Sequence, residues 1–325
     1  MKGKDALMIV VGLVAALLVP LSATFGADYP TRPVSLIVAY PAGGSTDVGA
    51  RILAAVAEKK FGQPILVVNK SGAGGQVGWT EIARQKSDGY GIGYINLPTF
   101  VLVILDPERK AAFKLDSFVP IINHVLDPGV IWVKADSPYK TLKDLIEDVK
   151  KRPGEVRAST TGIMSDDHLA ILMLEQAANV KFRLVHLDGS AVQMTATLGG
   201  QVDVSFDNVG AVTPRVVSGQ VRCLAVMDKE RSKFIPDVPT MVELGYPTVI
   251  SAATRGIAAP KGTPASAVKK LQEVLSEAMK DPAHVEKMEK AGLAIRVLVG
   301  EEYGKYIQEV HNTASSMFEL ARKAR

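Results

Sequence analysis

Three stretches of the sequence place glycines and hydroxyl-bearing residues where an apolar run ends. In the first, "YPAGGSTDVGARILAAV" (Tyr40–Val56), such residues separate "VSLIVAY" from a helical pattern. A helix start offers unpaired N–H groups and a partial positive charge, and glycines let a ligand approach the backbone. Asp47 is assigned to helix capping and loop bracing, and a capped turn without any ligand explains the same pattern. The candidate anion-binding residues are Gly43, Gly44, Ser45 and Thr46.

The second stretch is a glycine-rich turn, "NKSGAGGQVG" (Asn69–Gly78). A dinucleotide fingerprint of the form G-x-G-x-x-G needs glycine at position 77, where this chain has Val77. The mismatch disfavours a nucleotide site and favours a turn whose backbone lines the site of a small ligand.

The third stretch, "ASTTGIMSDDHLA" (Ala158–Ala170), again crowds hydroxyls between a strand and a helix. Asp166, Asp167 and His168 are adjacent on a helix and point in different directions, which disfavours a shared metal ion. Aspartates also suit the first turn of a helix, where the dipole favours negative charge. His168 is either a donor facing a ligand or a capping residue. The hydroxyl candidates here are Ser159, Thr160 and Thr161.

Catalytic chemistry has no clear pattern behind it. The nucleophile motif G-x-S-x-G is absent, and none of the five histidines is paired by motif with a candidate nucleophile. An exported hydrolase that uses Ser45 or Ser159 stays open as an alternative. No cofactor and no metal are predicted.

Short β-branched runs alternate with amphipathic ones, which is typical of an α/β protein with largely parallel sheets. Nine strands are too many for one minimal doubly wound unit, and two lobes with a crevice between them are expected. The predicted helices span 48–60, 141–151, 166–178 and 191–198. The predicted strands span 34–40, 64–69, 90–96, 118–125, 130–135, 155–160, 182–187, 202–208 and 221–227.

The C-terminal segment "EEYGKYIQEVHNTASSMFELARKAR" carries apolar residues at helical spacing, from Tyr303 to Met317. The pattern predicts a surface helix that packs onto the body of the protein.

The first 26 residues read as a secretory signal peptide. Lys2 and Lys4 precede the apolar run "ALMIVVGLVAALLV", and Thr24 and Gly26 fit a small-residue cleavage site. The run of about 14 residues is short for a bilayer span of about 20. With no cysteine near residue 26, lipid attachment is not expected, and the lone Cys223 permits no internal disulfide. A net charge of +4 over 325 residues excludes a nucleic-acid footprint.

The order of motifs along nearly the whole mature chain resembles the extracytoplasmic solute receptors of tripartite tricarboxylate transporters, the Bug family. The resemblance rests on "YPTRPVSLIVAYPAGGSTDVGAR", "GQPILVVNKSGAGGQVG", "SDGYGIGYIN" and "TLKDLIEDVKKRPGEVRASTTGIMSDDHLA". It continues through "GGQVDVSFDNVGAV", "SGQVRCLAV", "IPDVPTMVELGYP" and "RGIAAPKGTP".

The resemblance implies a bilobed periplasmic-binding-protein (Venus-flytrap) fold, with two doubly wound α/β domains joined by crossing strands. Lobe 1 is expected at 27–125 plus 250–325 and lobe 2 at 126–249. The implied protein is a periplasmic monomer that captures a di- or tricarboxylate or an aromatic acid and delivers it to the small and large permease subunits of a membrane transporter. A sensor that docks on a signalling partner stays open.

The family's contacts carry over to Gly43–Asp47 in the first lobe and to Ser159–Gly162 in the second. Gly189, Ser190, Ala191 and Asp207 are implied to flank the same crevice. The turn at Leu187–Gly189 has Asp188 where many members have lysine, so a cationic contact is lost. In "ATRGIAAPKGTP", Arg255 is either a bidentate partner for a second carboxylate or a surface arginine near a hinge.

Overall fold

The computed structural model describes residues 29–323. The predicted signal peptide, residues 1–26, lies outside the described residues. The strands are β1 (Val34–Val38), β2 (Ile65–Asn69), β3 (Gly91–Leu97), β4 (Phe118–Lys134), β5 (Arg157–Thr160), β6 (Arg183–His186), β7 (Val204–Asn208), β8 (Val221–Met227), β9 (Ala252–Pro260) and β10 (Ile295–Val299).

Helices connect these strands. The α-helices are α1 (Ser45–Phe61), α2 (Gln76–Arg84), α3 (Thr99–Leu105), α4 (Leu142–Lys151), α5 (Asp166–Ala178), α6 (Ser190–Leu198), α7 (Val209–Val217), α8 (Ala265–Met279), α9 (Pro282–Lys290) and α10 (Glu301–Lys323). Short 3₁₀ turns span Ala73–Gly75, Pro107–Arg109 and Leu115–Ser117.

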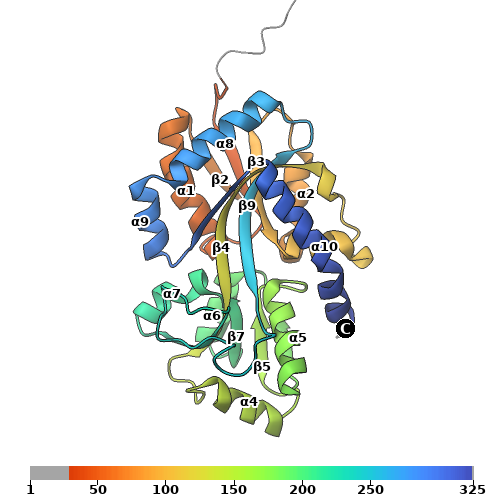
Figure 1. Ribbon diagram of the computed structural model, residues 1–325, viewed down its shortest axis with the longest axis vertical. Coiled ribbons are helices and arrows are strands. Elements are labelled where there is room, and N and C mark those ends of the chain that lie inside the picture. Colours follow the sequence, from red (N-terminus) through yellow and green to blue (C-terminus); the bar gives the residue numbers. More distant parts are fainter. Residues whose placement is uncertain (1–28, 324–325) are drawn as a thin grey trace, which may run out of the picture.

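The chain forms two bodies, one above the other, and β4 and β9 run from one body into the other (Figure 1). The upper body holds β1–β3 and β10 with α1–α3, α8 and α9, and the lower body holds β5–β8 with α4–α7. The strand order is β2-β1-β3-β9-β4-β7-β5-β6, with β8 and β10 also paired to β4. In each body the strands that precede helices pair in parallel, β1 with β2 and β3, and β5 with β6 and β7. The predicted bilobed α/β fold with crossing strands is confirmed.

The segment around Asp127 departs from the sequence prediction. Two strands were expected at 118–125 and 130–135, with Asp127, Pro128 and Gly129 between them. They instead belong to the single strand β4, whose Pro128 lies opposite Ala252 of β9. The amide of Gly129 restores the ladder by donating to the carbonyl of Ser251 at 2.7 Å. The strands β9 and β10 were not predicted.

The predicted lobe boundaries, between residues 125 and 126 and between residues 249 and 250, stay a prediction. Both β4 and β9 belong to the two bodies at once, so neither strand contains a natural break. The β4–β9 ladder does shift register between Asn123 and Val125, which marks an irregularity close to the expected boundary.

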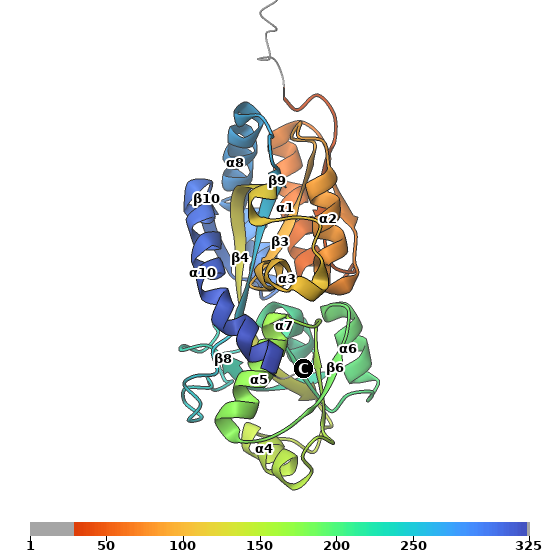
Figure 2. The same ribbon diagram turned by 90° about the vertical axis from the view of Figure 1, so that its right-hand side faces the viewer.

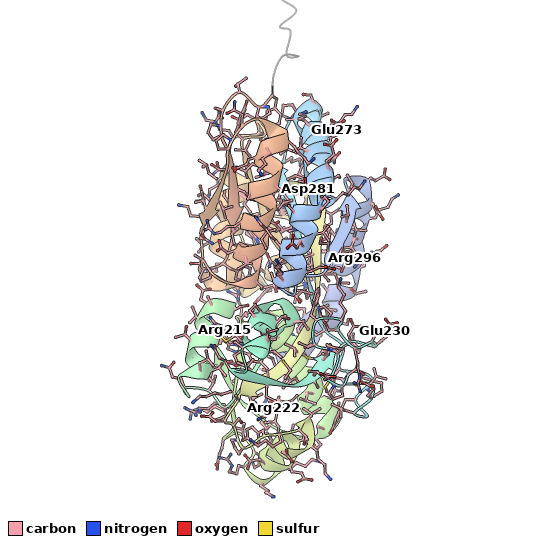
Figure 3. The ribbon with its side chains drawn as sticks, turned by 90° about the vertical axis from the view of Figure 1, so that its left-hand side faces the viewer. Arg215, Arg222, Glu230, Glu273, Asp281 and Arg296 are labelled. Carbon is pink, nitrogen blue, oxygen red and sulfur yellow. The ribbon has the colours of Figure 1, made fainter. Side chains whose placement is uncertain are left out.

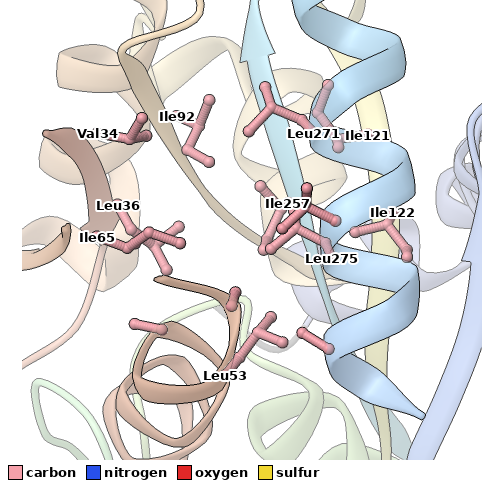
Figure 4. Close-up of a cluster of buried hydrophobic side chains, with 14 of the residues drawn as sticks. Val34, Leu36, Leu53, Ile65, Ile92, Ile121, Ile122, Ile257, Leu271 and Leu275 are labelled. Carbon is pink, nitrogen blue, oxygen red and sulfur yellow. The ribbon is translucent and has the colours of Figure 1, made fainter. Parts of the chain in front are cut away.

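Each body has its own apolar core. In the upper body, side chains from α1 and α8 meet those of the sheet (Figure 4). Leu53 of α1 and Leu271 of α8 are fully buried in this cluster, as are Leu36 of β1 and Ile257 of β9. Fixing these strands on both sides of β9 holds their carboxyl ends, and the loops that follow them, in place.

Helix α10 packs along the upper body and its C-terminal end reaches α5 of the lower body (Figures 1 and 2). Tyr303, Ile307 and Ala314 are buried against the core on its inner face. The predicted packing of this helix onto the body is confirmed.

A buried chain of hydrogen bonds crosses the upper body. Nδ1 of His284 lies 3.2 Å from the carbonyl oxygen of Met279, so it carries the proton and its Nε2 accepts. Nε2 of His124 lies 2.9 Å from that atom and must donate to it. The hydroxyl of Tyr94 then donates to Nδ1 of His124 at 2.7 Å. Two neutral histidines satisfy every contact in this way, whereas two charged ones would place N–H groups against each other. Burial lowers the pKa of both rings, that of His124 to well below its usual value.

This chain of histidines predicts loss of stability in acid. Because both pKa values are lowered on folding, the unfolded chain binds more protons below about pH 6.5, and stability falls as the pH falls. Each histidine contributes a slope of at most about 1.4 kcal/mol per pH unit. Urea unfolding of wild type and His284→Gln between pH 7 and pH 5 measures how the unfolding free energy changes with pH. This change is expected to be smaller in the variant, and equal changes in the two proteins would contradict the assignment of two neutral histidines.

Candidate functional site

Two helix starts from different bodies face each other across the gap. Helix α1 begins after Gly44 and helix α6 begins after Gly189, and neither start has a side chain as hydrogen-bonded cap. A Cβ placed on Gly44 would lie 3.8 Å from the amide nitrogen of Ala191 and 3.9 Å from Cβ of Ser190. The first-turn N–H groups have no partner within their own helices, so both starts offer donors and partial positive charge to the same space.

A cavity lies between these helix starts and the crossing strand β9, and it contains about 410 Å³ of space, part of it open to solvent. It brings together seven of the residues proposed from the sequence: Gly44, Ser45, Thr46, Thr161, Gly189, Ser190 and Arg255. The other lining residues are Tyr40, Pro41, Asn96, Thr99, Asp166, Asn208 and Ala253.

A second hollow adjoins the cavity on the side of α7. Gly43 and Ala191, both proposed from the sequence, line it together with Arg215 of α7. Figure 3 labels Arg215 on this side of the molecule, at the edge of the lower body. The two hollows share Gly44, Ser45 and Ser190, so the facing helix starts separate them.

The loop before α1 is braced by Asp47. Its carboxylate accepts from the amide of Gly43 at 2.9 Å, from Nδ2 of Asn69 at 2.9 Å and from Nε of Arg51 at 3.0 Å. Burial alone would raise the pKa of Asp47, but these hydrogen bonds outweigh it and hold the pKa below its usual value. The predicted bracing is confirmed. The predicted capping is wrong, because the N-cap is Gly44 and Asp47 lies in the first turn.

Two of the second-lobe hydroxyls face the interior of the lower body. The hydroxyl of Ser159 is fully buried and lies 2.6 Å from that of Ser205. Oγ1 of Thr160 lies 2.8 Å from Nδ1 of His186. Thr161 alone of the three lines the cavity, and its hydroxyl donates to Asp167. A four-residue strand that ends at Thr160 explains the difference, because only the residue after the strand reaches its carboxyl edge.

His168 and Asp207 support the site from behind. Nδ1 of His168 accepts from the amide of Met164 at 3.1 Å, and the cap of α5 is Ser165, so His168 is not the capping residue. Nor is His168 among the residues that line the cavity. Asp207 does not line the cavity either, but it accepts from the hydroxyl of Ser190 at 2.9 Å and so fixes the side chain of Ser190, which does.

Arg255 is buried at 2% exposure, so the expectation of a surface arginine is wrong. Its Nη1 donates to Asp127 at 2.7 Å. Its Nη2 donates to Ser45 of the upper body at 3.0 Å and to Asn208 of the lower body at 2.9 Å. The guanidinium therefore ties both bodies to the crossing strands. Nothing in the sequence pattern indicated its partner Asp127, which lies 128 residues away along the chain.

Three buried carboxyl groups, on Asp127, Asp166 and Asp207, interact with this guanidinium, and a fourth, on Asp167, interacts with Asp166 and Asp207. Burial raises the pKa of each, that of Asp167 to well above its usual value and that of Asp207 to about 7. Repulsion between the carboxylates raises the pKa of Asp166, Asp167 and Asp207 further. At Asp166 the hydrogen bond from Nδ2 of Asn208, at 2.8 Å, opposes this increase. This density of carboxyl groups was not predicted.

Several lining residues escaped the sequence analysis although a signal for them existed. Asn96 is the last residue of the predicted strand 90–96, and Asn208 is the last of 202–208. The rule that led to Gly43–Asp47, that ligands bind beyond the carboxyl ends of strands, applies to both. Asp166 was weighed only as a metal ligand. Within residues 29–323, no group of three or more histidine, cysteine or acidic side chains is arranged to hold a metal ion.

Neither serine proposed as a nucleophile has a base beside it among the described residues. The hydroxyl of Ser45 accepts from Arg255, and that of Ser159 contacts Ser205 and Gln193. In the described part of the chain, no helix is long and apolar enough to cross a membrane.

The bodies also touch away from the cavity, at Arg109. Its Nη1 donates to the carbonyl of Ala73 at 3.2 Å, and its Nη2 donates across the gap to the carbonyl of Ile163 at 3.0 Å. A Cβ on Gly74 would lie 3.7 Å from the same carbonyl. The glycine-rich turn Asn69–Gly78 therefore rests on the lower body here, and none of its residues lines the cavity. The expectation that this turn lines the ligand site is wrong.

Removing this contact is expected to loosen the closed arrangement without unfolding the protein. In Arg109→Met, loss of an exposed hydrogen bond between the bodies should weaken ligand binding by up to about tenfold, which corresponds to about 1.4 kcal/mol. Titration calorimetry with the best-binding acid measures it, with the exposed neighbour Lys110→Met as the control. Equal affinities for the two variants would show that Arg109 does not contribute to closure.

Known proteins share this architecture. Residues 49–321 match the sequence model of the family described as "Tripartite tricarboxylate transporter family receptor". The protein BugT of Bordetella pertussis is 34% identical over 268 residues, 82% of this chain and 82% of that protein. The solved periplasmic binding protein BugD is 33% identical at a TM-score of 0.82, covering 91% of this chain and 98% of that one. MatC from Rhodopseudomonas palustris, solved with bound malate, is 26% identical at a TM-score of 0.79, covering 90% and 100%.

Proposed function

The chain belongs to the tripartite tricarboxylate transporter receptor family, and on this basis we propose that it captures a small organic carboxylate in the cavity between its two bodies. Members of the family are substrate-binding receptors and not enzymes, so the hydrolase alternative is set aside. MatC, with its bound malate, supports the choice of ligand class.

One observation carries the proposal. The uncapped starts of α1 and α6 come from different bodies and point their N–H groups into one cavity. A carboxylate placed there accepts from both, and the hydroxyls of Ser45 and Thr46, whose oxygens accept from Arg255 and Asn96, add donors. Such an anion favours the closed arrangement, since only that arrangement brings both helix starts within reach.

The cellular setting belongs to the same proposal. We take residues 1–26 as a signal peptide, place the mature monomer in the periplasm, and divide it into lobes at 27–125 plus 250–325 and 126–249. The closed form then docks on the small and large permease subunits of a tripartite transporter. Docking on a signalling partner instead is the alternative, and transport measurements with and without the permease genes separate the two.

Thermal unfolding against a panel of organic acids tests the ligand class. A ligand present at about 1,000 times its Kd adds about 4 kcal/mol of stability, which raises Tm by several degrees in a protein of this size. We expect at least one acid of the panel to do so, with stoichiometric binding and no turnover. A panel of mono-, di- and tricarboxylates and amino acids that leaves Tm unchanged would contradict the proposal.

A further inference from the structure

The one positive side chain that lines the cavity is already ion-paired. Arg255 is the one basic residue among those that line it, and its Nη1 is already paired with Asp127 at 2.7 Å. Its Nη2 donates to Ser45 and Asn208, and its Nε is buried without a hydrogen-bond partner among the described residues. One carboxylate is provided for by the helix starts, while a second would have to share this single guanidinium with Asp127.

The wall of the cavity carries a negative group instead. Asp166 lines it at 6% exposure and accepts from Nδ2 of Asn208 at 2.8 Å. Behind it, one carboxylate oxygen of Asp207 and one of Asp167 are buried without a hydrogen-bond partner among the described residues. Three carboxyl groups, on Asp127, Asp166 and Asp207, thus share a single guanidinium in this part of the protein, and Asp167 adds a fourth beside Asp166 and Asp207. A ligand carboxylate next to Asp166 would meet like charge in a desolvated site.

An unrelated side chain on the same cavity also needs a hydrogen-bond donor. Asn96 of β3 is 6% exposed and lines the cavity, and its Nδ2 donates to Oγ1 of Thr46 at 3.0 Å. Its carboxamide oxygen is buried with no partner among the described residues. A buried acceptor without a partner is costly, and a donor on a bound ligand would satisfy it.

We propose that the ligand carries a protonated amine as well as a carboxylate, and that the amine lies between Asp166 and Asn96. The carboxylate then occupies the facing starts of α1 and α6, at the other end of the cavity. This inference rests on the proposed function and narrows it to amino acids and related zwitterions. It also excludes the di- and tricarboxylates that the sequence suggested, because their second charge has the wrong sign for Asp166.

A matched series of ligands tests the proposal on the wild-type protein. Pentanoate, 5-aminopentanoate and glutarate share one backbone and carry at its end a methyl group, an ammonium or a second carboxylate. Three- and four-carbon sets, with the α-amino acids of the same length, cover the unknown spacing. Titration calorimetry is expected to give the amino member of at least one set an affinity at least about tenfold higher than its partners, since a site built for a charged donor rejects analogues that lack it.

The outcomes separate this inference from the proposed function. If acids without an amine bind better than every amino acid, the inference is overturned and the carboxylate receptor stands. If neither kind of acid binds, the proposed function itself fails. A preference for amino acids supports both.

A variant tests whether the amine of the ligand contacts Asp166. Asp166→Asn keeps the acceptor for Asn208 but removes the charge, so the amino acid that binds best should lose about tenfold or more in affinity. The exposed Asp237→Asn is the matched control and should stay within about twofold. Unchanged affinity in Asp166→Asn would overturn the placement of the amine. If that variant does not fold by circular dichroism, the wild-type series decides alone.

Discussion

The variant Arg255→Met is expected to lose about 3–5 kcal/mol of unfolding free energy, because it leaves the carboxylate of Asp127 buried without its partner. The pair is fully enclosed, at 3% and 1% side-chain exposure, and it also connects Ser45 to Asn208 across the two bodies. Urea unfolding of wild type and variant measures the loss. Replacing both partners, in Asp127→Asn with Arg255→Met, should restore part of it, since no charge then remains buried.

The loss should also depend on pH. Burial raises the pKa of Asp127 and Arg255 opposes that increase, so the variant raises the pKa further. A carboxyl group whose pKa is raised on folding stabilises the protein only while it is protonated, and that contribution is lost as the pH rises. The difference in unfolding free energy between wild type and Arg255→Met should therefore grow from pH 5 to pH 8.

The control for this variant is an exposed ion pair. Lys261→Met, which breaks the pair with Asp116, should cost less than about 1 kcal/mol of unfolding free energy at any pH. A pH-independent loss in Arg255→Met would contradict this account of the pair.

The second large effect is expected in ligand binding. Gly44→Leu places a side chain where the starts of α1 and α6 face each other and should weaken binding by more than about 100-fold, or about 2.7 kcal/mol. A Cβ at this position meets only ordinary contacts, the nearest at 3.6 Å to the carbonyl of Pro41, and the backbone is not left-handed. Folding should therefore be nearly unaffected.

The control for this variant lies in the same loop. Ala42 is exposed and does not line the cavity, so Ala42→Leu adds the same side chain without obstructing the helix starts. The change in Tm produced by the best-binding acid should disappear in Gly44→Leu and persist in Ala42→Leu. Wild-type affinity in Gly44→Leu would show that the ligand binds elsewhere.

Local rules predicted those parts of the molecule that depend on local sequence. Strand ends followed by glycine and hydroxyl residues led to Gly44, Ser45, Thr46 and Thr161, which line the cavity, because the carboxyl ends of strands and the helix starts beyond them are features of neighbouring residues. Thr160 and Ser159 come one and two positions too early, and a strand of four residues points them into the lower body. A shift of one residue along a strand decides which side of the sheet a hydroxyl faces.

The interior electrostatics could not be predicted in this way. Arg255 and Asp127 meet only because β9 and β4 pair in antiparallel, with Asp127 opposite Ala253. Nothing within ten residues of either one indicates the other. The same holds for Asp166, whose role depends on Asn208 and Asn96 from two other strands. Long-range pairing, rather than composition, sets the charge of the cavity.

A crystal structure with the acid that stabilises the protein most is the most direct test of the central claim. The account predicts carboxylate oxygens within about 2.7–3.2 Å of first-turn amides of both α1 and α6, with the rest of the ligand directed toward Asp166 and Asn96. Electron density for the acid outside the space between these two helix starts would contradict it.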